Sequence, residues 1–182
     1  MTTPFGYFDL LESFVQPGCA VCRLLARDVE HYLDGLLYEF PTDPAVQDEF
    51  RASRGLCHTH TWALTRFNNA LPTAILYHAA LDELIKTLEH APQPERFGGL
   101  ARLLNNAAPS PLADALDAKK PCPACVLHDE SESIYLRVIG EYGSDERLRA
   151  AFEQSDGLCL PHLQGALRLT RDPQIARLLS DV

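Results

Sequence analysis

The sequence predicts an all-α protein in which two similar helical hairpins pack with a central helix. Apolar residues recur at intervals of three or four positions in most segments, as on one face of an α-helix, and the alternation typical of β-strands is weak throughout. A pattern of cysteines, turn glycines and apolar residues also occurs twice, roughly 100 residues apart. Together, these two observations favour a duplicated helical unit.

The first copy contains the signals of four helices. Pro41 ends the second of them, because the residue before a proline disfavours the helical conformation. Asp43 is expected to cap the third helix, with Pro44 in its first helical position. Gly55 is expected to take a positive φ in the turn that follows. The predicted helices span residues 8–15, 20–38 and 44–52, and a fourth begins near residue 57.

The segment between the copies predicts a longer central helix over about residues 73–90. Its expected apolar face should pack across both halves, and it consists of Tyr77, Leu81, Leu84, Ile85 and Leu88. Short helices are expected over residues 100–106 and 112–118. The second copy then predicts helices over residues 124–142 and 144–154 and from about residue 160.

This pattern divides the chain into three segments. Residues 1–70 hold the first copy, residues 71–120 the central helix and connector, and residues 121–182 the second copy. The whole chain has 182 residues, which fits one domain or two small ones. Units as small as each copy have small hydrophobic cores, and they commonly need a metal ion or a disulfide for stability.

All six cysteines belong to the repeated pattern, and each copy adds one histidine. Each copy has a Cys-x-x-Cys pair followed later by Gly-Leu-Cys-x-x-His. Three thiols and one imidazole form a complete tetrahedral ligand set of the kind that structural zinc sites use. The predicted ligands are Cys19, Cys22, Cys57 and His60 in the first copy, and Cys122, Cys125, Cys159 and His162 in the second.

Chain length suggests that each site forms within one copy. A helix of about 19 residues leads about 28 Å away from Cys22, and the next helix with its turn can bring the chain back to Cys57. Pairing across the copies also remains open. In the first copy the repeat selects His60 over His58, which would be an outer neighbour of the site or exposed. Trp62 is expected in the core beside this site.

Zinc, at two ions per chain, is the cofactor that the ligand sets favour. An iron–sulfur cluster is a minor alternative, because three cysteines with one histidine are less usual there. Thiol–disulfide exchange at the Cys-x-x-Cys pairs, disulfide bonds alone and another metal also stay open. The N-terminus has no basic, apolar export signal. Six cysteines in such a chain favour metal binding in the cytoplasm.

The formal net charge of −9 argues against nucleic acid or an anionic membrane as the main partner. No stretch is apolar for long enough to span a membrane. A basic patch of Arg147, Arg149, Arg168 and Arg171 is more simply a solvated helix face, as is the group His128, Asp129 and Glu130. Common catalytic motifs such as HExxH, the P-loop and GxSxG do not occur.

The repeated ligand motifs give the chain a resemblance to a known group of proteins. The arrangement Cys19-x-x-Cys22 with Gly55-Leu56-Cys57-x-x-His60, and its second occurrence ending in Cys159-x-x-His162, resembles an uncharacterised family of bacterial and archaeal helical proteins. The resemblance covers both copies, and its specific part is the ligand motifs. It implies two metal-type sites on the eight ligands named above, and it implies no substrate or reaction.

We therefore expect a non-enzymatic, cytoplasmic scaffold or adaptor that binds another protein. This expectation comes from the closed ligand sets, which leave no coordination position for a reacting water molecule. Two alternatives remain. One is a redox or metal-sensing switch that oxidation of the ligand thiols would trigger. The other is a thiol–disulfide oxidoreductase that uses the Cys-x-x-Cys pairs.

Overall fold

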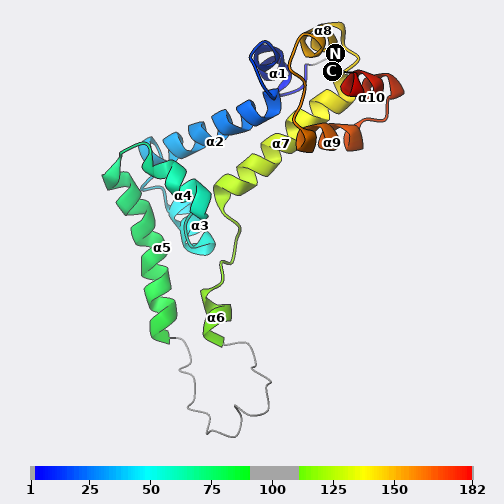
Figure 1. Ribbon diagram of the computed structural model, residues 1–182. Helices are drawn as coiled ribbons and strands as arrows, with labels where there is room; N and C mark the ends of the chain where they lie inside the picture. The colour runs from blue at the N-terminus through cyan, green and yellow to red at the C-terminus, as the bar shows by residue number, and fades with distance from the viewer. Residues whose placement is uncertain (1–2, 91–110, 182) are drawn as a thin grey trace, which may run out of the picture. The chain divides into compact units, whose positions relative to one another are not determined.

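The computed structural model describes residues 3–90 and 111–181 of the chain, and this part is α-helical with no β-strand (Figure 1). The all-α class that the sequence predicted is confirmed. The helices are α1 (Tyr7–Phe14), α2 (Ala20–Tyr38), α3 (Pro44–Ser53), α4 (His58–Thr65), α5 (Ala70–His90), α6 (Pro111–Leu116), α7 (Pro123–Tyr142), α8 (Glu146–Glu153), α9 (Leu160–Leu169) and α10 (Pro173–Ser180).

Aspartate caps start three of these helices. The side chain of Asp43 accepts hydrogen bonds from the backbone N–H groups of Ala45 and Val46 at the start of α3. Asp145 does the same for α8, and Asp172 caps α10. The cap and proline of α3 were predicted correctly. Helix α10 was not predicted, although its Asp-Pro start repeats the signal that identified α3.

The described chain forms two compact units. The first combines residues 1–32 with residues 126–182, and the second is the continuous stretch 33–125. Helix α2 therefore begins in the first unit and ends in the second, and α7 begins in the second and ends in the first. These units do not coincide with the predicted segments 1–70, 71–120 and 121–182, which stay a prediction about the repeat. The helix expected over residues 100–106 lies outside the described residues.

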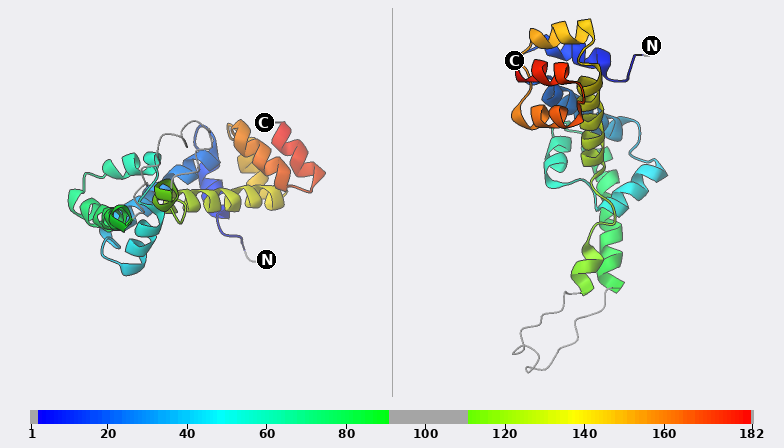
Figure 2. Two further views of the ribbon diagram at one scale, coloured as in Figure 1. Left: turned by 90° about the horizontal axis from the view of Figure 1, so that it is seen from below. Right: turned by 90° about the vertical axis from the view of Figure 1, so that its right-hand side faces the viewer.

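The core of the first unit joins the N-terminal helix to the C-terminal third of the chain. Helix α1 packs against α8, with the rings of Phe14 and Phe152 edge to face at 5.4 Å between centroids. The right-hand view of Figure 2 shows these two helices side by side. The buried core also includes Leu10, Val21, Leu24, Tyr135, Ile139, Leu148, Ile175 and Leu179.

Polar contacts tie the same two segments of the first unit together. The hydroxyl of Tyr7 donates to the carboxylate of Asp145. The backbone N–H of Gly18, directly before the first Cys-x-x-Cys pair, donates to Asp156 over 2.7 Å. Because a hydrogen bond to a charged acceptor is stronger than one between neutral groups, these contacts fix the start of α2 beside the loop that leads to α9.

The second unit is built around the packing of α3 against α5. The rings of Phe50 and Tyr77 meet edge to face at 5.9 Å. A Cβ added to Gly55 would lie 3.0 Å from the Tyr77 ring, and its φ of +86° also favours glycine. The backbone N–H groups of Lys119 and Lys120 donate to the carbonyl of Ala52 over 2.8 and 3.1 Å. These last two bonds hold the segment that leads into α7 against the end of α3.

Helix α5 leaves much of its predicted apolar face exposed. Leu81, Ile85 and Leu88 are about half exposed, at 54%, 53% and 48%. The buried residues of α5 are instead Pro72, Leu76, Ala79 and Ala80. The physical reason is that Ala79 and Ala80 are small enough to let α5 approach α3 closely, so their face occupies the interior in place of the leucine-rich face. Trp62 of α4, expected in the core, is 62% exposed.

Among the described helices, none combines the length and the apolar character that crossing a bilayer demands.

Candidate metal centres

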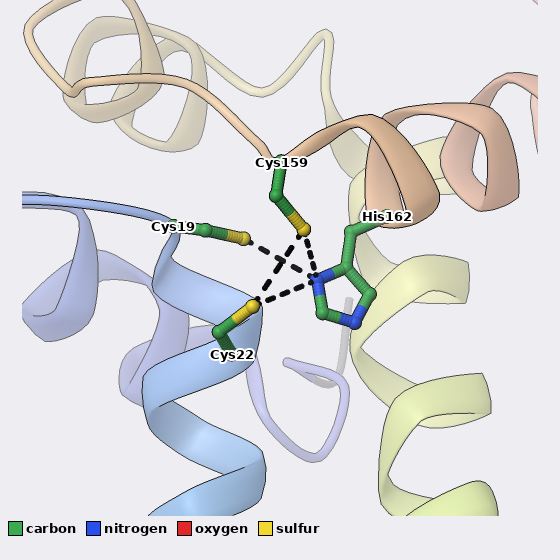
Figure 3. Close-up of side chains that lie close together, drawn as sticks. All are labelled: Cys19, Cys22, Cys159 and His162. Atoms are coloured by element: carbon green, nitrogen blue, oxygen red, sulfur yellow. Dashed lines mark hydrogen bonds between the residues drawn. The ribbon is translucent and has the colours of Figure 1, made fainter.

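The first cluster brings three sulfur atoms to one histidine nitrogen. Cys19 precedes α2 and Cys22 lies in its first turn, while Cys159 is the N-cap of α9 and His162 lies in the first turn of that helix. The Nδ1 atom of His162 lies 3.3, 3.4 and 3.1 Å from the Sγ atoms of Cys19, Cys22 and Cys159 (Figure 3). The Sγ atoms of Cys22 and Cys159 are 3.6 Å apart. His162 is buried and Cys22 is exposed.

The second cluster has the same composition and lies in the second unit. Cys57 is the N-cap of α4, His60 lies in its first turn, and Cys122 and Cys125 flank the start of α7. The Nδ1 atom of His60 lies 3.3, 3.6 and 3.5 Å from the Sγ atoms of Cys57, Cys122 and Cys125. All eight predicted ligands thus fall into two groups of four, and the candidate ligand atoms of each group lie within 4.8 Å of one another.

These contacts fit a metal ion better than they fit hydrogen bonds. An imidazole nitrogen carries either one hydrogen or one lone pair, so Nδ1 cannot bond three thiols at once. A tetrahedral zinc ion with Zn–S of about 2.3 Å would place two sulfurs roughly 3.8 Å apart and a sulfur and a nitrogen roughly 3.6 Å apart. The observed S–S separations of 3.6 and 3.7 Å are close to the first value. An ion at the centre would satisfy all four donors.

The thiols of the first cluster differ in acidity. Burial alone would raise the pKa of the Cys19 thiol, but hydrogen bonds from the backbone N–H groups of Cys159 and Cys22 outweigh it and lower that pKa to about 7. Burial and the sulfur atoms of Cys159 and Cys19 raise the pKa of Cys22 to about 12. The cluster therefore resists full ionisation by itself, and a divalent cation would supply the missing compensation.

The second cluster repeats this division. Burial opposes ionisation of Cys57, but the backbone N–H of His60 and the side chains of Cys125 and Cys122 lower the pKa of its thiol. Burial and the neighbouring sulfur of Cys57 raise the pKa of Cys125 to about 12. In both clusters, backbone N–H groups at the start of a helix donate to the cysteine sulfur. Helix N-termini stabilise thiolates in this way.

The expected pairing of ligands within one copy is wrong. Each cluster combines the Cys-x-x-Cys pair of one copy with the Cys-x-x-His pair of the other. Chain length allowed both arrangements, and contacts between distant segments decide between them. The packing of α1 on α8 and the bond from Gly18 to Asp156 bring the start of α2 to Cys159. The bonds from Lys119 and Lys120 to Ala52 bring the start of α7 to Cys57.

His58, the neighbour of Cys57 in the first copy, lies outside the clusters. His58 is exposed, and its Nε2 accepts a hydrogen bond from the indole N–H of Trp62 over 3.0 Å. The two rings also meet edge to face. The choice of His60 from the repeat therefore agrees with the geometry, and His58 with Trp62 forms a separate pair on the surface of α4.

Sequence reasoning missed one residue beside the first cluster. The carboxylate oxygen Oε1 of Glu132 in α7 lies 3.4 Å from the Nε2 atom of His162. Glu132 also groups with His128, which is partly buried, and with Asp129, which is exposed. No spacing rule in the sequence connects α7 to the first turn of α9, so this contact depends on how the two helices pack.

Comparison with known proteins gives a family without an assigned role. The model described as "Family of unknown function (DUF6062)" matches residues 16–174, which include both clusters. An "Uncharacterized 23.9 kDa protein in xynA 3'region" from Caldicellulosiruptor sp. (strain Rt8B.4) is 25% identical over 174 residues, covering 95% of this chain and 77% of the relative. No solved structure matches the chain.

Paired substitutions will test the crossed arrangement. Cys22→Ser with Cys159→Ser removes two ligands from one cluster, so we expect the protein to keep one equivalent of metal, held by the other. Cys22→Ser with Cys57→Ser removes one ligand from each cluster, and we expect it to lose both equivalents or bind them far more weakly. Elemental analysis after dialysis measures the difference. The opposite ranking of the two variants in metal content would instead support pairing within one copy.

Proposed function

The chain belongs to the Family of unknown function (DUF6062), and within that family we propose that it is a non-enzymatic helical scaffold whose two clusters each hold one structural zinc ion. The observation that carries this proposal is the convergence of three sulfurs on one imidazole Nδ1, twice in one chain. Three thiolates and one imidazole suit zinc better than magnesium or calcium, which prefer oxygen ligands. An iron–sulfur cluster is the lesser alternative.

The closed ligand sets support a structural rather than a catalytic ion. Catalytic zinc usually has three protein ligands and keeps a position for water, whereas four protein ligands leave none. With three thiolates, a zinc ion would leave a net charge of −1 on each centre. Cys57 and Cys159 are N-caps, and the positive end of a helix dipole favours such a charge.

The ions would act as clamps between segments that are distant in sequence. Cys22 and Cys159 are separated by 137 positions, and Cys57 and Cys125 by 68. In the first unit, the ion would join the two separate pieces of chain that share one core. Because such a site does not exist in the unfolded chain, the free energy of metal binding adds to the stability of the fold.

A cytoplasmic location is part of this proposal. All six cysteines are free thiols in the structure and all six lie in the two clusters. Thiols persist in reducing compartments, whereas cysteines of exported proteins are commonly oxidised to disulfides.

Metal analysis tests the proposal directly. Freshly purified protein should contain two equivalents of zinc per chain and should be colourless. Removal of the zinc with a strong chelator should lower the melting temperature and the helical circular dichroism signal, because ligation and folding are coupled. Re-addition of zinc should restore both. A metal-free protein with unchanged stability would contradict the proposal, and a brown sample would point to an iron–sulfur cluster and electron transfer.

A scaffold acts by binding another protein, and α5 carries a surface that fits this role. Six of its exposed residues are spaced alternately three and four positions apart, like the seam of a coiled coil. They are Leu71, Ala74, His78, Leu81, Ile85 and Leu88. From this exposed apolar seam, we propose as partner a protein that offers an amphipathic helix.

Charged substitutions on α5 test this surface. Leu81→Glu with Ile85→Glu should abolish capture of the partner with little change in melting temperature, since both side chains are about half exposed. Val15→Glu, which places the same charge at an exposed apolar residue outside α5, is the matched control and should keep the partner. Quantitative affinity capture compares the three proteins, and an identified partner is then added back in purified form. Equal capture by all three would rule out α5 as the binding surface.

One observation favours a second candidate function, a redox switch that releases metal. Cys22 is the exposed ligand of the first cluster, and its sulfur lies 3.6 Å from that of Cys159. Hydrogen peroxide could oxidise the two thiolates to a disulfide; they would supply two electrons, and the peroxide with two protons would become two water molecules. The ion would lose two ligands and leave. An oxidoreductase based on a Cys-x-x-Cys disulfide would involve Cys19 and Cys22 instead.

Peroxide titration tests the redox-switch hypothesis. A switch should release zinc at low peroxide and form a disulfide between Cys22 and Cys159, which peptide mapping detects, and Cys22→Ser should prevent that disulfide. Retained zinc and unchanged helicity under mild peroxide would exclude the switch. If alkylation finds all six thiols protected by metal and the protein is inactive in a reductase assay, the oxidoreductase reading is excluded as well.

A further inference from the structure

The histidine of the first cluster has a carboxylate behind it. Its Nδ1 atom faces the three sulfurs, and its Nε2 atom lies 3.4 Å from Oε1 of Glu132. The His162 side chain is 9% exposed and that of Glu132 is 32% exposed. We propose that Glu132 is a positioning residue for the first metal centre, which it serves by accepting the Nε2 hydrogen of His162. This inference rests on the proposed function, because it presumes that the cluster binds zinc.

The chemistry of a metal-bound imidazole requires such an acceptor. When Nδ1 binds an ion, the neutral ring carries its hydrogen on Nε2, and in a buried ring that N–H needs a partner. A carboxylate fixes the tautomer and the plane of the ring, and it makes the ligand nitrogen a better electron donor. Glu132 therefore would hold His162 in the orientation in which Nδ1 meets all three sulfurs.

Helix packing holds the two residues at this distance. A Cβ added to Gly165 of α9 would lie 2.6 Å from a methyl carbon of Leu136 in α7, so the glycine allows the two helices to come close. His162 lies three residues before Gly165, and Glu132 lies four residues before Leu136. Each polar residue is therefore about one turn from the point of contact, on the same side of its helix. Tyr135 and Leu136 are buried, which anchors this part of α7.

The charge of Glu132 is compatible with a nearby anionic centre. A zinc ion with three thiolates would carry a net charge of −1, and a second negative charge close by would normally be unfavourable. Here the partly exposed carboxylate keeps contact with water, and the Nε2 hydrogen lies between it and the ion. The negative charge would increase the basicity of the ring, and so would strengthen the bond from Nδ1 to zinc.

Substitution of Glu132 in the full-length chain tests this role, with the second centre as an internal reference. Glu132→Ala should weaken one of the two zinc sites by about 10- to 100-fold, the range found for such outer partners, and should leave the other unchanged. Glu132→Gln should recover part of the loss, since its amide oxygen still accepts a hydrogen bond. The control Glu130→Gln alters an exposed residue of the same helix and should behave like wild type.

Competition with a chromophoric chelator measures the two affinities, and the absorption of the Co²⁺-substituted protein reports the geometry of each centre. Long-range ¹H–¹⁵N spectra of histidine should show the Nε2 hydrogen of His162 protected in wild type and in rapid exchange in Glu132→Ala. Comparison of the metal-free melting curves separates this effect from a general loss of folding. Two unchanged affinities and an unchanged Co²⁺ spectrum in Glu132→Ala would overturn the role of Glu132 alone. Failure of the wild type to bind metal would overturn the proposed function with it.

Discussion

The pairing of a Cys-x-x-Cys pair from one part of the chain with a Cys-x-x-His pair from another is the constraint on which both compact units depend. In the first unit, the pairing joins the N-terminal residues to the last third of the chain, and the apolar core of α1, α7 and α8 forms across the same junction. In the second unit, the pairing joins Cys57 and His60 to Cys122 and Cys125 at the end of that stretch. The separation of the ligands differs twofold, from 68 to 137 positions. This twofold difference in loop length changes the entropic cost of closing the loop by only about 0.6 kcal/mol.

Both clusters use the same local device to present their ligands. A cysteine at the N-cap and a histidine three residues later lie on one face of a first helical turn, so the sulfur and Nδ1 atoms converge without strain. The backbone N–H groups of those turns also favour the ionised thiolate, which explains the lowered pKa of Cys19 and Cys57. Burial and neighbouring sulfur atoms raise the pKa of the Cys22 and Cys125 thiols, and a bound cation would balance the charge of their ionised forms. Binding of an ion would therefore be coupled to the release of protons.

The two clusters are not equivalent in their surroundings. The first combines a buried histidine, a carboxylate behind that histidine and an exposed cysteine. Its imidazole side would be held rigidly, while its Cys22 side is open to solvent and to small oxidants. In the second, all four ligands are partly exposed, and the exposed residues His58 and Trp62 contact each other. If one centre responds to the redox state of its surroundings, the exposure of Cys22 makes it the first.

The sequence by itself predicted the described helices, apart from α10, and the eight candidate ligands. The Asp-Pro start of α3, the positive φ of Gly55 and the choice of His60 over His58 all follow from short-range chemistry, because a cap, a turn or an i, i+3 pair involves only a few neighbouring residues. Only the tertiary structure decided which ligands meet, which face of α5 is buried and that Glu132 lies behind His162. Those outcomes depend on the packing of α1 on α8, on small residues that let α5 approach α3, and on Gly165 between α9 and α7. Contacts between distant segments leave no periodic trace in a single chain, and several pairings satisfy the same distances along it.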